Sequence, residues 1–91
     1  DRCWEVIPAC RVKLDRKPSE VLRQIYADTA LYSREALRDT IETFGGEHVM
    51  YGTDFPHTNA DMGPSLARIN ELPPELRDNV RGRNAKRVFG F

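Results

Sequence analysis

Residues 25–52 read IYADTALYSREALRDTIETFGGEHVMYG, and this stretch decides the fold. Its two ends, residues 25–29 and 48–52, are short and hold β-branched and aromatic side chains, which predicts a strand at each end. Between them, residues 34–44 carry apolar side chains at helical spacing. A strand, a helix and a second strand within fewer than thirty residues predict a βαβ unit with parallel strands.

Local signals mark both ends of the central helix. Ser33 is a good N-cap, because its hydroxyl can accept a hydrogen bond from a free N–H of the first turn. Gly45 and Gly46 follow the last apolar residue and permit a left-handed exit from the helix. The apolar stripe of the helix consists of Leu37, Ile41 and Phe44. These signals predict a helix over residues 34–44.

The βαβ unit is followed by a polar loop over residues 53–61 and by three short predicted helices. The second of these helices starts after Pro73-Pro74, and we expect Gly82 to end it. Two strands cannot form a sheet that is covered on both faces, as parallel sheets normally are. We therefore expect residues 1–91 to be the last two β/α units, with closing helices, of a larger α/β protein.

The length limits what the chain can form. Its 91 residues allow one domain with a thin core. A complete (β/α)₈ barrel is excluded, since it typically needs ~250 residues. The chain starts at Asp1 and shows no signal-peptide pattern, so we expect either a processed start or a piece of a longer protein. No apolar run approaches the ~20 residues that span a bilayer.

The charge balance argues against several classes of partner. Fourteen basic side chains balance fourteen acidic ones, which argues against nucleic acid or an anionic membrane as the main partner. The basic residues near the C-terminus predict a solvated surface or a subunit contact.

Cys3 and Cys10 are interpreted as small apolar packing residues, which fits a reduced, cytoplasmic setting.

Asp54 is the main candidate for chemistry. Strand alternation puts Met50, Gly52 and Asp54 on one face, with Asp54 last in its row at the C-terminal end of a parallel strand. Ligands bind at that end in α/β folds. A carboxylate there can ligate a divalent metal or act as a general base for a metal-bound water. The alternative is that Asp54 caps the turn into Phe55-Pro56, as Asp often does.

The motif Tyr51-Gly52-Thr53-Asp54-Phe55-Pro56-His57 resembles the strand-eight motif of the amidohydrolase-related (amidohydrolase 2) family, which includes aminocarboxymuconate-semialdehyde decarboxylase. Flanking segments strengthen the resemblance. Residues 25–29 resemble strand seven of the family, residues 35–37 the start of the next helix, and residues 44–50 the run before strand eight. Residues 83–90 resemble the terminal helix, so the resemblance covers residues 18–91.

The resemblance implies a TIM barrel with a metal, usually zinc, at its C-terminal mouth. The family's ligands are a His-x-His pair from strand one, a His from strand five and the Asp that closes strand eight. Asp54 matches this last ligand. Family members decarboxylate aromatic or muconate-type acids without an organic cofactor, or hydrolyse lactones and related compounds.

The chain also departs from the family pattern. It contains no His-x-His, and its only histidines are His48 and His57. His57 lies three residues past Asp54 and is the candidate substrate-binding residue, with simple exposure as the alternative. His48 starts its strand about 20 Å from Asp54 by strand rise and receives no role. For Asp28 we expect a buried salt bridge or a turn contact rather than catalysis.

Two functions from different classes remain open. In the first, the chain is part of a metal-dependent decarboxylase or hydrolase that acts on a small carboxylic acid. Most metal ligands of such an enzyme are absent here, so these 91 residues alone should not be competent. In the second, the chain is a non-catalytic barrel remnant that binds a partner or itself. Exposed strand edges favour self-association, which predicts a homo-oligomer.

Overall fold

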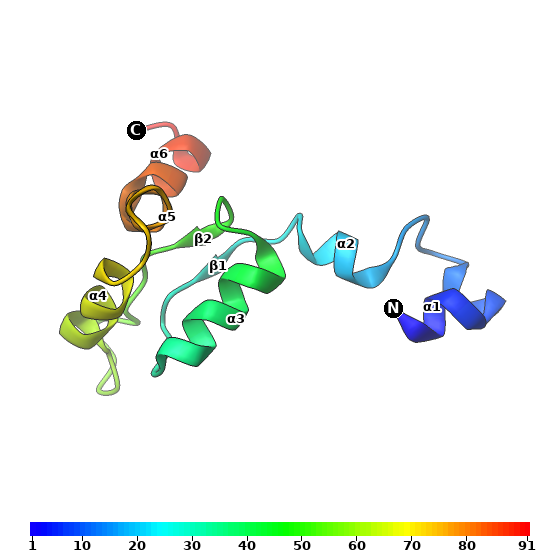
Figure 1. Ribbon diagram of the computed structural model, residues 1–91, viewed down its shortest axis with the longest axis horizontal. Helices are drawn as coiled ribbons and strands as arrows, with labels where there is room; N and C mark the ends of the chain where they lie inside the picture. Colours follow the sequence, from blue (N-terminus) through cyan, green and yellow to red (C-terminus); the bar gives the residue numbers. More distant parts are fainter.

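The computed structural model describes residues 1–91 and contains eight short helices and strands with two further turns of helix (Figure 1). In chain order these are α1 (Arg2–Val6), a 3₁₀ turn (Pro8–Arg11), α2 (Pro18–Leu22), β1 (Ala27–Asp28), α3 (Arg34–Phe44), β2 (Val49–Met50), α4 (Met62–Asn70), α5 (Pro74–Asp78), a π turn (Asn79–Arg83) and α6 (Asn84–Phe89). None of the helices combines the length and the apolar character that crossing a membrane requires.

The βαβ unit predicted from residues 25–52 is present. Strands β1 and β2 pair in parallel, with Ala27 opposite Val49 and Asp28 opposite Met50. Each strand is two residues long instead of the predicted five, because the flanking backbone groups bond elsewhere. The N–H of Ile25 bonds back to Leu22 in a helical turn, and the N–H of Tyr51 bonds to the carbonyl of Val80.

Helix α3 has the predicted limits. The Ser33 hydroxyl accepts a hydrogen bond from the N–H of Ala36 at 3.0 Å, as expected of an N-cap. Gly45 ends the helix at a φ of 95°, a backbone conformation that side chains disfavour. The helix buries Leu37 and directs Ile41 and Phe44 toward the same core.

The hydrophobic core lies between α3, β2 and the C-terminal helices. Its four buried members are Leu37, Val49, Ile69 and Val80. Half-buried leucines and aromatic or branched residues surround them: Leu31, Ile41, Phe44, Leu72 and Leu76. Only seven of the 91 residues are buried, so the core is as thin as the length predicts.

The C-terminal helices differ from the prediction at Gly82. Gly82 does not end a helix, because α5, the π turn and α6 follow one another without a break. In the π turn the N–H of Asn84 bonds to the carbonyl of Asn79, five residues back. The carbonyl of Val80 is then available to the N–H of Tyr51, at 2.9 Å. A contact with β2 that local signals do not encode therefore overrides the expected stop.

The N-terminal segment lies to one side of this body, and its cysteines correct the prediction (Figure 1). Cys3 and Cys10 are joined by a disulfide and are not packing residues of the core. Helix α1 ends before Pro8, and the chain turns back so that the two Cα atoms lie 6.1 Å apart. The indole N–H of Trp4, which donates to the carbonyl of Leu14 at 3.0 Å, closes the same turn.

Candidate functional site

The C-terminal ends of β1 and β2 meet at one edge of the sheet, because the strands are parallel. The predicted polar loop leaves β2 there and returns to α4. Asp54 lies in this loop, exposed, with a φ of 62°. Asp adopts this left-handed conformation more readily than most residues do. Its carbonyl accepts the N–H of His57 at 2.9 Å and closes a turn over the cis peptide bond before Pro56.

The carboxylate of Asp54 makes no hydrogen bond or ion pair within the chain. The side-chain contact in the turn comes from Thr53, whose hydroxyl accepts the N–H of Phe55 at 3.3 Å. The capping role that the sequence left open for Asp54 is therefore filled by Thr53 and by the Asp54 main chain. The Asp54 carboxylate is therefore exposed to solvent beyond the C-terminal end of β2, where no partner in the chain competes with a ligand.

His57 is exposed in the same turn, three residues after Asp54. Its main chain is held on both sides, since its N–H bonds to Asp54 and its carbonyl accepts the N–H of Ala60 at 3.0 Å. The structure thus brings the two predicted site residues into one tight turn. A role of His57 in substrate binding stays a prediction.

Asp28 makes a turn contact, which is one of the two alternatives expected from the sequence. One carboxylate oxygen accepts the N–H of Ala30 at 3.0 Å, and the side chain forms no ion pair. The rest of the side chain lies directly over Gly52, where a Cβ would approach the Asp28 Cβ to 2.9 Å. The space that a side chain at position 52 would need is therefore filled by Asp28.

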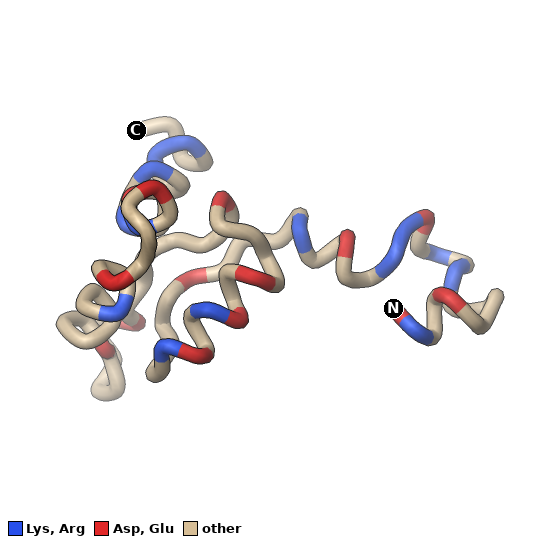
Figure 2. The backbone as a smooth tube through the Cα atoms, viewed as in Figure 1, with Lys and Arg blue, Asp and Glu red and all other residues tan.

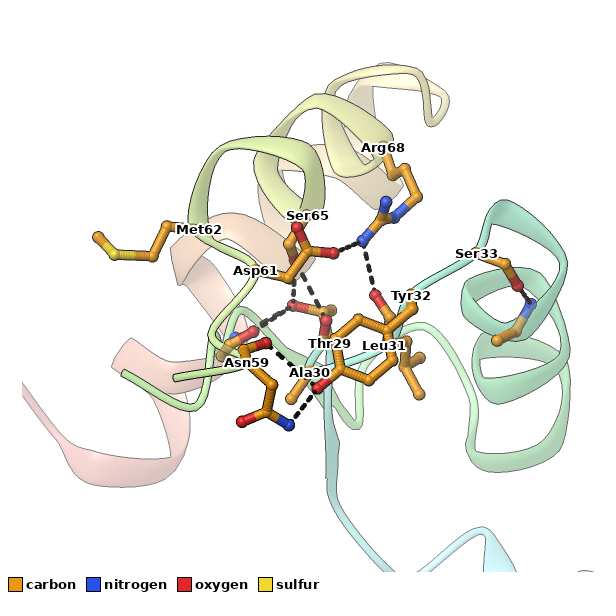
Figure 3. A network of polar contacts seen from close by, with 12 residues as sticks. Thr29, Ala30, Leu31, Tyr32, Ser33, Asn59, Asp61, Met62, Ser65 and Arg68 are labelled. Carbon is orange, nitrogen blue, oxygen red and sulfur yellow. Dashed lines mark hydrogen bonds and ion pairs between the residues drawn. The ribbon is translucent and has the colours of Figure 1, made fainter. Parts of the chain in front are cut away.

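Buried polar side chains hold the strand ends together, and sequence reasoning did not find them (Figure 3). The Thr29 hydroxyl contacts both the N–H and the carbonyl of Gly52, each at 3.1 Å. The Ser65 hydroxyl of α4 donates to the Thr29 carbonyl at 3.1 Å. Farther along, the Asn84 amide donates to the carbonyls of Gly46 and Val49, each at 2.8 Å. Thr29 directly after β1 and Ser65 on the buried face of α4 carry no local signal that would identify these partners.

Two further polar contacts, one half-buried and one exposed, fix the far end of the loop (Figure 3). Arg68 donates to the carbonyl of Leu31 at 2.6 Å and forms an ion pair with Asp61. The phenol of Tyr32 accepts a hydrogen bond from the Asn59 amide at 2.8 Å. The segment after β1 and the loop after β2 are therefore tied to each other beside Asp54.

Lys and Arg recur along the C-terminal helices (Figure 2). Contacts within the chain involve several of these side chains. Arg77 and Arg83 pair with Asp78, at 3.1 and 3.9 Å. Arg87 donates to the carbonyl of Glu47 and to the side chain of Asn84. Of these, Arg87 attaches α6 to the segment before β2 through the Glu47 carbonyl.

Residues 1–91 do not form a complete metal site. No three His, Cys, Asp or Glu side chains lie close enough together to hold a metal ion. Asp54 has the ligand chemistry of one carboxylate in such a site, since carboxylate oxygen is an established ligand for zinc and for harder cations. Any further ligands would have to come from outside these residues.

The chain belongs to the amidohydrolase family, whose family model matches residues 5–91. This confirms the resemblance drawn from the motif around Asp54. No curated protein matches the chain.

Among solved structures, the chain is similar to the crystal structure of 5-carboxyvanillate decarboxylase LigW from Sphingomonas paucimobilis. The two are 33% identical in sequence and superpose with a TM-score of 0.68 over 85% of this chain. The match covers 24% of the decarboxylase, so the chain spans about a quarter of that protein's length. The family and this structure together support an α/β fold for the chain.

Proposed function

We propose that residues 1–91 are the C-terminal β/α units of a metal-dependent enzyme that acts on an aromatic or muconate-type carboxylic acid. The observation that carries the proposal is the exposed Asp54 carboxylate, which lies past the C-terminal end of a parallel strand and has no partner in the chain. Ligand sites of α/β folds lie at this end. In this proposal β1 and β2 are strands seven and eight of a barrel, and the first six strands lie outside these residues.

Decarboxylation ranks ahead of hydrolysis in this proposal. The similar solved structure is a decarboxylase, and its name specifies an aromatic acid as the substrate. Asp54 would be one ligand of a divalent metal, for which we propose zinc. The bound metal would supply a Lewis acid. Asp54 would place a negative charge at the C-terminal mouth of the proposed barrel, and His57 would contact the substrate from the same turn.

The experiment uses the intact protein that contains these residues. Asp54→Asn keeps the size and the turn, because Asn also adopts the left-handed conformation, but it removes the charge. We expect turnover, measured as CO₂ release from aromatic acids, to fall about 10²–10⁴-fold, as for the loss of a general base. Bound metal should fall with it, while the melting temperature stays close to that of the parent.

Asp39→Asn is the matched control, because Asp39 is an exposed carboxylate on α3. It should leave both turnover and metal content unchanged. A folded Asp54→Asn protein with full metal content and near-normal turnover would show that Asp54 has no part in the chemistry. An intact protein without metal and without CO₂ release would favour the non-catalytic remnant instead.

A cytoplasmic location and a homo-oligomeric state remain proposals. The Cys3–Cys10 disulfide provides a test of the first, because disulfides are rare in the cytosol. Thiol labelling of rapidly quenched cells, read by mass spectrometry, should find both cysteines free if the protein is cytoplasmic. A bonded pair would place the protein in an oxidising compartment.

A further inference from the structure

The backbone ladder between the two strands ends before the candidate site. Its last pair is Asp28 with Met50, and Asp54 lies four residues beyond Met50. Ladder hydrogen bonds therefore do not hold the segment that leads to Asp54. Some other contact has to set where this segment leaves the sheet.

The Thr29 hydroxyl takes over where the ladder stops. It donates to the carbonyl of Gly52 and accepts the N–H of the same residue, each at 3.1 Å. A hydroxyl has one proton to donate and two lone pairs, so it can make both bonds at once. Thr29 is 2% exposed, so water competes little for its hydroxyl. One side chain thus extends the strand pairing two residues toward Asp54.

Ser65 contacts Thr29 from α4, and the two hydroxyl oxygens lie 3.4 Å apart. Its hydroxyl, also 2% exposed, donates to the carbonyl of Thr29 at 3.1 Å. Ser65 belongs to the first turns of α4, the helix that the loop containing Asp54 enters. Both ends of this loop, Gly52 before it and α4 after it, are therefore tied to Thr29 (Figure 3).

We propose that Thr29 is a positioning residue for Asp54, acting through its two hydrogen bonds to Gly52. The catalytic consequence rests on the proposed function, whereas the positioning itself does not. A carboxylate that is exposed and unpartnered has no contact of its own to fix its direction, so its placement depends on the backbone that carries it. Thr29 and Ser65 supply that placement from the buried side.

The test compares Thr29→Val with Thr29→Ser in the intact protein. Valine keeps the shape and removes the hydroxyl, whereas serine keeps the hydroxyl. We expect Thr29→Val to lower kcat about 10²-fold with a small change in KM, because misplacement by about 1 Å can have that effect. Thr29→Ser should restore kcat to within a few-fold of the parent. A merely structural role would lower the melting temperature but leave kcat per folded enzyme unchanged, and that result would overturn the proposal. Equal loss in both variants would also overturn it.

Amide hydrogen exchange tests the positioning without any substrate. In Thr29→Val the Gly52 amide should exchange about tenfold faster or more, since its acceptor is gone, while the Ala27 amide, which donates to the carbonyl of His48 at 2.9 Å, keeps its protection. Unchanged protection of Gly52 would contradict the proposal even if the enzyme is inactive for other reasons. Ser65→Ala removes the bond to the Thr29 carbonyl and the 3.4 Å contact between the two hydroxyls but keeps the Thr29 hydroxyl. It should give a smaller increase in Gly52 exchange and is available if Thr29→Val does not fold. No increase in Ser65→Ala would then count against the proposal.

Discussion

At the scale of single residues, Gly52 and Asp28 share the open face of the sheet beside the candidate site. The Asp28 side chain lies so close to the Gly52 backbone that a Cβ would meet it at 2.9 Å from Cβ and 3.2 Å from the carboxyl carbon. These atoms are near the root of a short side chain and cannot move far. Glycine is thus required here by a neighbour on the other strand rather than by its own φ.

Gly52→Ala should destabilise the protein by about 1–3 kcal/mol, the usual cost of forcing extra atoms into a packed position. Urea unfolding followed by circular dichroism measures the change. Gly63→Ala is the matched control, because nothing lies within 4 Å of its added Cβ, and Gly63 lies in α4. The control should be neutral or stabilising by about 0.4–1 kcal/mol. If Gly52→Ala and Gly63→Ala had the same free energy of unfolding, β1 and β2 would be able to move apart around the added methyl group without loss of stability.

Residues whose role depends on their own neighbours in sequence were predictable. Ser33 was identified as an N-cap from the helix it precedes. Asp54 was singled out by its motif and as the last residue of a strand, but β2 ends at Met50 and Asp54 lies in the loop that follows, so its role stays a prediction. Thr29 was not identified, because its partners Gly52 and Ser65 lie 23 and 36 residues away. A lone Thr at the end of a strand carries no local signal of such contacts.

At the scale of elements, one buried amide connects α6 to β2. The side chain of Asn84 is fully buried and donates to two carbonyls, those of Gly46 and Val49. Asn84→Ala would leave the buried carbonyl of Val49 and the half-buried carbonyl of Gly46 without this donor. We expect a loss of about 2–3 kcal/mol, since an unsatisfied buried group costs about 1–3 kcal/mol.

Asn70→Ala provides the comparison for Asn84→Ala. Asn70 is exposed at the end of α4, so its replacement should change the free energy of unfolding by no more than about 0.5 kcal/mol. Thermal unfolding of both variants measures the difference. If Asn84→Ala and Asn70→Ala have the same melting temperature, the amide of Asn84 does not contribute to the attachment of α6.

The ion pair between α3 and the residue after α4 predicts a pH dependence. Arg34 donates two hydrogen bonds to the Glu71 carboxylate, at 2.5 and 2.7 Å. These bonds, together with the charge of Arg34, hold the pKa of Glu71 below its ordinary value of 4.5. A carboxyl pKa that is lower in the folded chain than in the unfolded chain stabilises the fold at every pH above the unfolded-chain pKa. This stabilisation is lost as the pH falls through the pKa of the folded chain. Because the pair is exposed, solvent and salt weaken the effect.

Arg34→Gln should therefore raise the pKa of Glu71 toward its ordinary value. Carbon NMR of the Glu71 carboxyl, titrated from neutral pH downward, measures the shift. Arg38→Gln removes a neighbouring exposed charge of α3 that has no ion-pair partner, so it should leave the titration nearly unchanged. A Glu71 midpoint that does not move in Arg34→Gln would mean that the pair does not persist in solution.

Elements defined by local signals were predicted well, and those defined by distant contacts were not. The limits of α3 follow from Ser33 at one end and Gly45 at the other. The strands are shorter than predicted, because Tyr51 bonds to Val80 rather than to a strand. The same bond explains why Gly82 does not end its helix.

At the scale of the whole molecule, the chain is more extended than its length requires. Its radius of gyration is 15.6 Å, whereas a compact chain of this length has about 12 Å. Large aromatic side chains remain exposed along it, namely Tyr26, Tyr32, Phe55, Phe89 and Phe91. Phe89 and Phe91 stack on each other with their ring centroids 6.3 Å apart, and exposed apolar surface favours association.

The 91-residue chain by itself should therefore self-associate or unfold without clear cooperativity. Light scattering coupled to size-exclusion chromatography measures its mass, and urea unfolding measures its cooperativity. A monodisperse monomer that unfolds cooperatively with ~5–15 kcal/mol, the range of natural domains, would contradict this prediction.

The π turn at residues 79–83 makes the length of this helix as important as its composition. Gly82 has open space around it, so a change of side chain there meets nothing. Its removal is a different matter. With one residue fewer, the amide of Asn84 would lie four residues after Asn79, the turn would close as an ordinary α-helix, and the carbonyl of Val80 would return to the helix. The N–H of Tyr51 would then lose its acceptor, two residues before Thr53 and the loop that carries Asp54. A position that tolerates almost any substitution is thus one that should not tolerate a deletion.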